Sequence, residues 1–224
     1  MNKILVAATA VALAVSASAQ TNQVLSRNAV GYQRIDLPAG GLEFICNQFN
    51  QLDSSPSVLS NALPAVSNNT QAILWDAGIQ QYVTITRTKG SWGPGGTNPI
   101  QRGRGFFIRS PGGIQQTIYI MGEVPDRLTA TQTVSYAVSG ISALGGGYPV
   151  STQWTNTQLA LGLPNNDQVI VWDAAITNYL TYTKTKGAWG AGTNLVLRPG
   201  QAFFVRKNSA GTNVWTEVKP YTWP

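Results

Sequence analysis

The stretch Ile73-Leu74-Trp75-Asp76-Ala77 decides the fold together with Phe106-Phe107-Ile108-Arg109, because the chain contains both twice. The second copy runs from Ile170-Val171-Trp172-Asp173-Ala174 to Phe203-Phe204-Val205-Arg206. The matching elements lie 97 positions apart: Trp75 and Trp172, Tyr82 and Tyr179, Lys89-Gly90 and Lys186-Gly187, Trp92-Gly93 and Trp189-Gly190, Phe106-Phe107 and Phe203-Phe204. Such a period is too long for a solenoid unit and suits a small domain. The chain is therefore one module written twice.

Alternation within each copy predicts β-structure. Residues 82–89 and 179–186 alternate strictly, as a half-buried strand does. Short strands separated by turn signals about every eight to twelve residues are typical of all-β sandwiches and barrels. Residues 58–63 and 157–163, each stopped by a proline, predict at most a turn or two of helix. We expect an all-β protein of two tandem sandwich- or barrel-like repeats, with one pseudo-symmetric body as the alternative.

The N-terminus has the pattern of an export signal. A short basic region is followed by an apolar run over residues 4–15 and by the small residues Ala17-Ser18-Ala19, which predicts cleavage before Gln20. A retained N-terminal anchor is the other interpretation of the apolar run. No later segment approaches the roughly 20 apolar residues of a membrane-spanning helix. We expect a secreted or cell-surface protein without a transmembrane segment after cleavage, with the periplasm as the alternative location.

These signals divide the chain into three parts. Residues 1–19 are the predicted signal peptide, and residues 20–126 form the first β repeat with an N-terminal arm. Residues 127–224 form the second repeat. The best linker is Pro125-Asp126-Arg127, which lies between the two copies of the module.

Composition limits the possible chemistry. The chain has no histidine, which excludes Ser-His-Asp and Cys-His catalysis and removes the commonest transition-metal ligand. Its nine carboxylates are scattered, and no run of the calcium-loop type is present. The single cysteine, Cys46, follows Phe44-Ile45, which favours a buried thiol over a reactive or intermolecular one. We predict no catalytic residues, no metal and no cofactor, and expect that the protein is not an enzyme.

The net charge of +6 bears on partners. A basic exported protein favours anionic surfaces such as acidic polysaccharide, although a mildly basic solvated surface explains the same balance. Nucleic acid is not expected as a partner, because no recognised nucleic-acid motif occurs.

The candidate binding residues lie at the glycine-rich loop of each copy. Trp92 and Trp189 occupy matching positions there, and an exposed indole is a platform for a sugar ring or a partner protein. The alternative is that each ring folds back to cap its own core. Four cations precede the loops and alternate along their strands, so each pair is expected to share a face near its tryptophan: Arg87, Lys89, Lys184 and Lys186. This patch would bind an acidic glycan or protect a strand edge from aggregation.

Two other repeated features have structural interpretations. Asp76 and Asp173 follow a tryptophan and are expected to start turns by accepting backbone hydrogen bonds. Phe106-Phe107 and Phe203-Phe204 are expected to place one ring in the core and the other on the opposite face of the sheet.

The opening Asn28-Ala29-Val30-Gly31-Tyr32, followed by Leu37-Pro38-Ala39-Gly40, resembles that of a group of small secreted all-β proteins from Verrucomicrobia and related bacteria. The second copy resembles a β module of surface proteins in those bacteria and in Bacteroidota, with Trp172-Asp173, Tyr179 and Pro199-Gly200-Gln201-Ala202-Phe203-Phe204-Val205. The first copy departs from that module at Arg102-Gly103-Arg104, and the second lacks a clear Val-Gly-Tyr opening. The resemblance implies an exported location and an all-β fold, and it implies no activity.

Two functions follow as hypotheses. The first is an exported, non-catalytic structural or surface protein that self-assembles by strand addition, with residues 20–37 pairing to the sheet edge of a neighbour. The second is a carbohydrate-binding or adhesion module that uses the loop tryptophans and the adjacent cations. The partner would be another copy of the chain in the first case and extracellular polysaccharide in the second.

Overall fold

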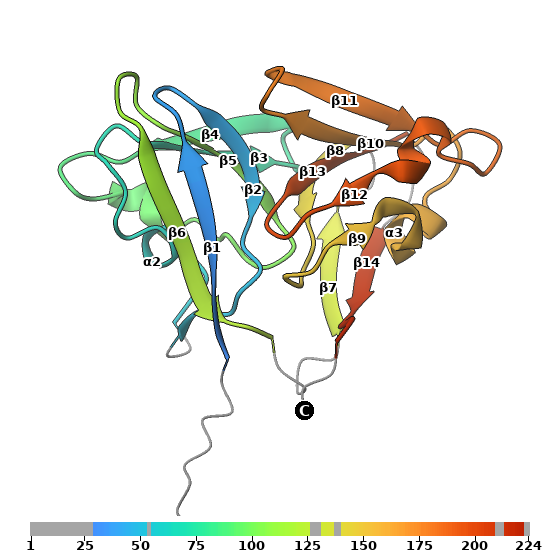
Figure 1. Ribbon diagram of the computed structural model, residues 1–224, viewed down its shortest axis with the longest axis horizontal. Helices are drawn as coiled ribbons and strands as arrows, with labels where there is room; N and C mark the ends of the chain where they lie inside the picture. Colours follow the sequence, from blue (N-terminus) through green and yellow to red (C-terminus); the bar gives the residue numbers. More distant parts are fainter. Residues whose placement is uncertain (1–28, 53–54, 126–130, 137–139, 209–212, 222–224) are drawn as a thin grey trace, which may run out of the picture.

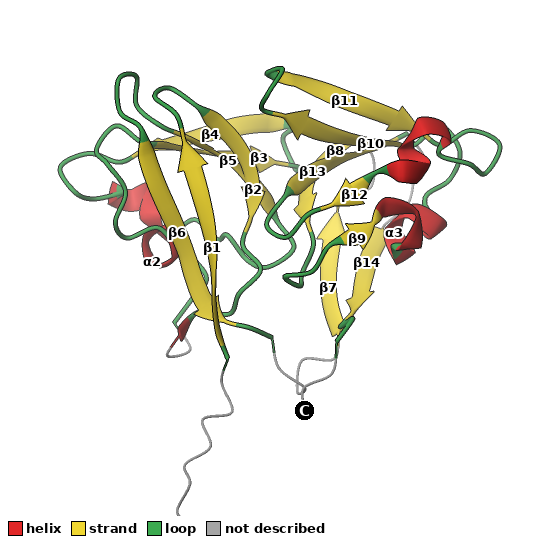
Figure 2. Cartoon of the chain, viewed as in Figure 1, coloured by secondary structure: helices red, strands yellow, loops and turns green. Residues whose placement is uncertain are grey.

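The computed structural model describes residues 29–52, 55–125, 131–136, 140–208 and 213–221 (Figures 1 and 2). The first repeat contains β1 (Val30–Leu37), β2 (Leu42–Cys46), α2 (Leu59–Ala62), β3 (Gln71–Asp76), β4 (Gln81–Thr86), the 3-10 helix η2 (Gly93–Thr97), β5 (Gly105–Arg109) and β6 (Gln116–Glu123). The second contains β7 (Thr131–Tyr136), β8 (Gly140–Gly145), β9 (Thr152–Gln153), η3 (Trp154–Asn156), α3 (Gln158–Gly162), β10 (Gln168–Asp173), β11 (Asn178–Thr183), η4 (Gly190–Asn194), β12 (Val196–Leu197), β13 (Ala202–Lys207) and β14 (Asn213–Val218).

Each repeat is a small sandwich of two antiparallel sheets. In the first repeat the β1–β6 pair covers one face of a four-stranded sheet ordered β2-β5-β3-β4. In the second repeat the β7–β14 pair covers a sheet ordered β8-β13-β10-β11, and β9 and β12 form a short extra pair. The predicted all-β class is confirmed, as are the short helical turns at α2 and α3. The predicted repeat boundary at residues 126 and 127 and the predicted signal peptide lie outside the described residues.

Each repeat has its own apolar core, and strand alternation explains how it forms. Phe106 of β5 and Phe203 of β13 point into the cores of their own repeats. Phe107 and Phe204 point to the opposite faces, into a third apolar cluster that the two repeats share. This confirms the expected division of each Phe-Phe pair. The second ring of each pair joins the two sandwiches.

The shared cluster has approximate two-fold symmetry. The Trp75 indole nitrogen donates to the carbonyl oxygen of Ile141 at 2.7 Å, and that of Trp172 donates to Leu42 at 3.1 Å, so each repeat reaches the equivalent strand of the other. Two main-chain bonds repeat this relation. They run from Cys46 N to Gly200 O at 2.9 Å and from Gly145 N to Gly103 O at 3.1 Å.

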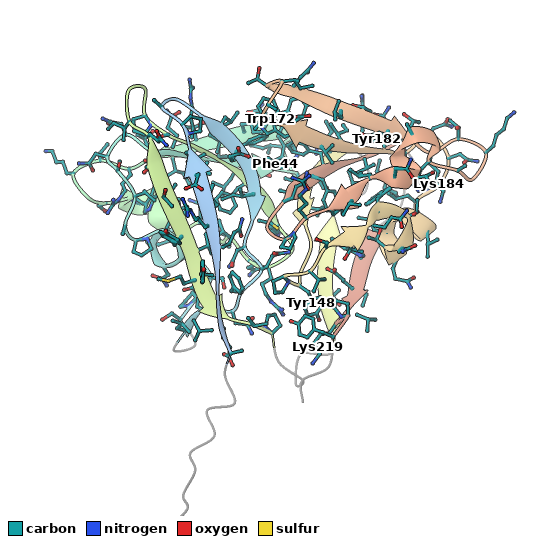
Figure 3. The ribbon with its side chains drawn as sticks, viewed as in Figure 1. Phe44, Tyr148, Trp172, Tyr182, Lys184 and Lys219 are labelled. Carbon is teal, nitrogen blue, oxygen red and sulfur yellow. The ribbon has the colours of Figure 1, made fainter. Side chains whose placement is uncertain are left out.

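The symmetry breaks at one ring. Phe44 lies between Phe107 and Phe204, with ring centroids 4.2 and 4.4 Å away and nearly parallel planes (Figure 3). The corresponding residue of the second repeat is Ala143, which lies in the same cluster. One phenyl ring therefore fills the centre of the interface from one side only.

Cys46 also lies at this interface. Its side chain is fully buried, as the sequence predicted, and burial raises the pKa of the thiol far above its ordinary value. A side chain at Gly145 would collide with Cys46, so the close approach of β2 to β8 requires glycine there. Within the described residues, no helix is long and apolar enough to cross a membrane.

Candidate strand-accepting groove

The repeated Lys-Gly sequence at the start of each glycine-rich loop forms a tight turn. Thr88 and Ser91 exchange two backbone hydrogen bonds of 2.8 and 2.9 Å around Lys89 and Gly90, whose φ angles are 50° and 77°. Two central residues with positive φ are typical of the type I′ hairpin turn. Lys186-Gly187 forms the same turn in the second repeat, with φ angles of 50° and 80°. The repeated Lys-Gly is thus explained by backbone geometry.

The two loop tryptophans are buried. Trp92 and Trp189 are each only 5% exposed and belong to the cores of their own repeats. Their indole nitrogens donate to the carbonyl oxygens of Leu63 at 2.9 Å and of Ala160 at 3.2 Å. The expectation of two exposed ring platforms was therefore wrong. The glycine-rich loops let each ring fold back and cap its own sandwich. This arrangement is the alternative interpretation of the sequence given above.

The four predicted cations do not form a common patch. The ammonium group of Lys184 is buried 5.8 Å from the Trp189 ring centroid (Figure 3). It donates at 2.7 to 3.1 Å to three carbonyl oxygens around the end of α3: Ala160, Leu161 and Leu163. Arg87 likewise donates to Pro64 at 2.7 Å and to Gly90 at 2.9 Å.

Lys89 and Lys186 instead lie in the exposed turns just described, beyond the ends of β4 and β11. The prediction that each pair of cations shares one face was therefore wrong, because the turn redirects the chain between them. Lys184 satisfies carbonyl groups around the end of α3, whereas Arg87 bonds one carbonyl group after α2 and one in the Lys89-Gly90 turn.

The repeated aspartates start turns, as predicted. Asp76 accepts from the amides of Gly78 at 2.8 Å and Ile79 at 3.3 Å, and Asp173 accepts from Ala175 at 3.0 Å. The part of the chain that the structure describes contains no group of three Cys, Asp or Glu residues placed to hold a metal ion.

A different surface combines unpaired backbone groups with a groove. Glu123, at the end of β6, exchanges hydrogen bonds of 2.9 and 3.0 Å with Asn50, on the side of β6 away from β1. In an antiparallel strand every second residue directs its N–H and C=O to the same side. Thr117, Tyr119 and Met121 therefore direct theirs away from β1 as well. No described residue pairs with these groups, so they form an open sheet edge.

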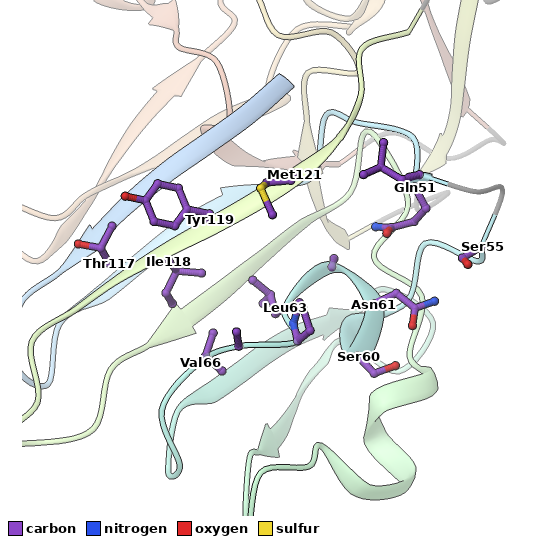
Figure 4. Close-up of a pocket in the computed structure, with 14 residues that line it drawn as sticks. Gln51, Ser55, Ser60, Asn61, Leu63, Val66, Thr117, Ile118, Tyr119 and Met121 are labelled. Carbon is purple, nitrogen blue, oxygen red and sulfur yellow. The ribbon is translucent and has the colours of Figure 1, made fainter. Parts of the chain in front are cut away.

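The open edge is one wall of a groove of about 470 Å³ (Figure 4). The opposite wall consists of Ser60 and Asn61 from α2 with the segment that follows it, including Pro64. The apolar lining includes two buried core side chains, Leu63 and Ile118. On the outer side of β6, Tyr119 and Met121 are 47% and 56% exposed. The edge is therefore flanked by apolar side chains both inside and outside the sheet.

Among the described residues of the second repeat, the helix and the outer strand leave no such opening, and the reason lies in the sequence. Asn98 O accepts from Leu59 N at 3.0 Å, and Leu195 O, 97 positions later, accepts from Trp154 N at 2.8 Å. Trp154 thus takes the place of Leu59. A turn of η3 is then added before α3, and α3 packs against β14.

Aromatic rings occupy the corresponding space. Trp154 is fully buried, with ring centroids 5.0 Å from Trp189 and 5.6 Å from Phe203. Trp215 of β14, which is also buried, replaces Ile118 of β6 at the position 97 residues later. Sequence reasoning missed the groove because it searched for what the copies share. The signal available was the mismatch between residues 54–63 and 153–163.

A second hollow lies between the repeats. Two adjoining cavities of about 670 and 660 Å³ are both bordered by Glu43 and Trp172. Partial burial raises the pKa of the Glu43 carboxyl group, for which no described residue provides a hydrogen bond or ion pair. Arg198 and Tyr182 line the first of these cavities.

No protein-family model, curated protein or solved structure matches the chain.

Proposed function

We propose that this chain is an exported, non-catalytic structural or surface protein whose copies associate by strand addition at the open edge of β6. The observation that carries the proposal is the row of unpaired main-chain groups at Thr117, Tyr119 and Met121 beside an apolar groove. An extended segment entering there would gain main-chain hydrogen bonds from β6 and bury apolar side chains at the same time. The export signal predicted from the sequence and the resemblance to secreted bacterial proteins support the proposed location.

The groove also restricts the kind of partner. α2 and the segment after it stand on the far side of the opening, so the edge of another folded sheet would collide with them. A single extended segment would fit between the two walls, as in other recognition sites formed by a strand and a helix. We therefore assign the groove to an extended segment of a second copy.

A matched pair of proline variants tests the proposal. Tyr119→Pro removes one outward amide from the β6 edge, and the pyrrolidine ring obstructs an incoming strand. Tyr32→Pro is the control, because Tyr32 lies on β1, packs edge-on against Tyr119 at 6.1 Å and also directs its amide away from the β1–β6 ladder. Both variants keep the hydrogen bonds between β1 and β6.

Sedimentation velocity over a wide concentration range is the measurement. The wild type and Tyr32→Pro should associate as concentration rises, while Tyr119→Pro should stay monomeric, with circular dichroism confirming that both variants fold. A wild type that is monomeric at every concentration would contradict self-association. Equal association of the two variants would show that the β6 edge is not involved.

Carbohydrate binding is the second candidate function, and its candidate site differs from the one predicted from the sequence. Trp92 and Trp189 are buried, but Trp172 borders an open hollow beside Glu43, whose carboxyl group has no hydrogen-bond or ion-pair partner among the described residues. An indole ring with a hydrogen-bonding acceptor beside it suits a sugar. Native gel electrophoresis in a soluble neutral glucan and in a polyuronate tests this function. Retardation that Glu43→Gln abolishes would support it, and unretarded migration in both gels would exclude binding to these polysaccharides.

A further inference from the structure

We infer that the segment entering the β6 groove is residues 20–28 of a second copy, an assignment that rests on the proposed function. The groove sets the length of its occupant. It is closed at one end by the Asn50–Glu123 pair and at the other by Ser67, whose amide donates to the Gln116 side chain at 3.1 Å. The open edge between them spans residues 117–121, which at about 3.4 Å per residue accepts a strand of about five residues.

The described part of the fold offers no spare strand of this kind. Every strand of the described residues already belongs to a ladder within the same chain. This corrects part of the initial expectation, because residues 30–37 of the predicted donor arm form β1 and pair with β6 along their whole length. Residues 20–28 precede β1 and lie outside the described residues. They supply nine residues, which exceeds the length that the open edge requires.

Charge and side-chain pattern favour this segment. None of the described residues that line the groove is Asp, Glu, Lys or Arg, and residues 20–26 contain no charged residue either. Val24 and Leu25 are consecutive, so in an extended strand they point to opposite faces. One would cover the buried floor at Ile118, and the other would lie outside beside Tyr119 and Met121. Both faces of the β6 edge are apolar at this level, so an adjacent apolar pair matches them.

The geometry favours exchange between copies over insertion into the same chain. Val124 N donates to Ala29 O at 2.8 Å, so the chain enters β1 at the end of the sheet where Asn50 pairs with Glu123. The groove lies across β6 from β1 and is closed at this same end by the Asn50–Glu123 pair, which stands between the start of β1 and the groove of the same chain. A segment from a neighbouring molecule does not meet this obstruction.

One donor and one acceptor per chain define the mode of assembly. The equivalent position in the second repeat is closed by Trp154 and α3, so the described residues form one groove of this kind. Donor and acceptor are different surfaces, which makes the contact heterologous. Such contacts form linear chains or closed rings, and the smallest closed ring is a dimer in which two copies exchange their segments.

Two variants, each of which disables one side of the contact, test this inference. Val24→Asp/Leu25→Asp places charges on the donor and leaves the groove intact, whereas Tyr119→Pro disables the groove and leaves the donor intact. Each should be monomeric alone by sedimentation velocity. Their mixture should form a one-to-one complex and nothing larger, because only one productive contact remains. Thr21→Asp/Asn22→Asp adds the same charge outside the apolar pair and should still self-associate more strongly than Val24→Asp/Leu25→Asp.

The outcomes separate the inference from the proposed function. If Val24→Asp/Leu25→Asp associates as strongly as the wild type, and adding Tyr119→Pro abolishes that association, the assignment of the donor is overturned. Strand addition at β6 would still stand. A monomeric wild type would overturn both. A synthetic peptide of residues 20–28 should dissociate wild-type assemblies, and its failure to bind Val24→Asp/Leu25→Asp would also count against the assigned donor.

Discussion

The two repeats share one scaffold, and they differ at the space between the helix and the outer sheet. In the first repeat α2 stands away from β6 and leaves a groove beside an open strand edge. In the second repeat an added helical turn and the rings of Trp154 and Trp215 occupy that space. The parts that both copies keep are turns, caps and core: Lys-Gly, Trp-Gly and Phe-Phe. The comparison indicates that function is to be sought where the copies diverge.

The largest expected change in stability tests whether the Trp154 ring fills the space that is a groove in the first repeat. Trp154→Ala should lower the free energy of unfolding by about 3–5 kcal/mol, because a buried ring packed on Trp189 and Phe203 leaves a cavity. Chemical denaturation measures this change. Leu161→Ala is the control on α3, since Leu161 is exposed, and it should change stability by no more than about 0.5 kcal/mol. A loss of less than about 1 kcal/mol for Trp154→Ala would mean that the ring is not a filling element.

The next test addresses the asymmetric ring at the interface. Phe44→Ala should cost about 3 kcal/mol, because Phe44 stacks on Phe107 and Phe204 in the shared cluster. If the two-fold relation holds, adding Ala143→Phe should restore part of the loss by supplying a ring from the other side. Ala143→Phe alone should destabilise by about 1–3 kcal/mol through overpacking. A double variant less stable than Phe44→Ala would contradict the proposed equivalence of these positions.

A smaller difference in stability is expected between variants of Lys184 and Arg87, the two cations that bond backbone carbonyl groups. Lys184→Met should cost about 1–3 kcal/mol, since three carbonyl oxygens near the end of α3 lose a donor in a buried position. Arg87→Met should cost less, because its bonds to Pro64 and Gly90 lie at the surface, where water replaces the guanidinium. Thermal unfolding of the two variants side by side checks the order, and the reverse order would contradict it.

The smallest effect concerns pH. Glu217 of β14 stands where the first repeat has the buried Ile120, and burial raises the pKa of its carboxyl group despite the amide of Gly147 and the charge of Arg102. A raised pKa in the folded state means that the buried anion opposes folding at neutral pH. The contribution of Glu217 to stability should therefore increase as pH falls from above its folded pKa towards its ordinary value of 4.5.

Glu217→Gln provides the comparison for this pH effect. The variant should be relatively more stable at neutral pH, and its advantage over the wild type should shrink across the same pH window. Urea denaturation at several pH values measures the difference. A wild type that loses stability relative to Glu217→Gln on acidification would reverse the assigned sign.

Sequence reasoning predicted the elements whose signals are local. Strict alternation predicted β4 and β11, the stop at proline predicted α2 and α3, and the aspartates after tryptophan predicted turns. It failed for Trp92 and Trp189, because a glycine-rich loop does not specify whether its tryptophan turns inward. It also missed the contacts of Trp75 and Trp172 across the interface, which join strands far apart in sequence. The groove depends on non-local packing around Trp154, so periodicity could not reveal it.

Amide hydrogen exchange at the two outer strands, followed by NMR, tests the central claim most directly. The claim predicts that the amides of Thr117, Tyr119 and Met121 on β6 become protected at least about tenfold as concentration rises and the open edge acquires a partner strand. The amides of Val214, Thr216 and Val218 on β14 should not change. Association that leaves the β6 edge amides unprotected, or that protects β14 equally, would contradict strand addition at the first repeat.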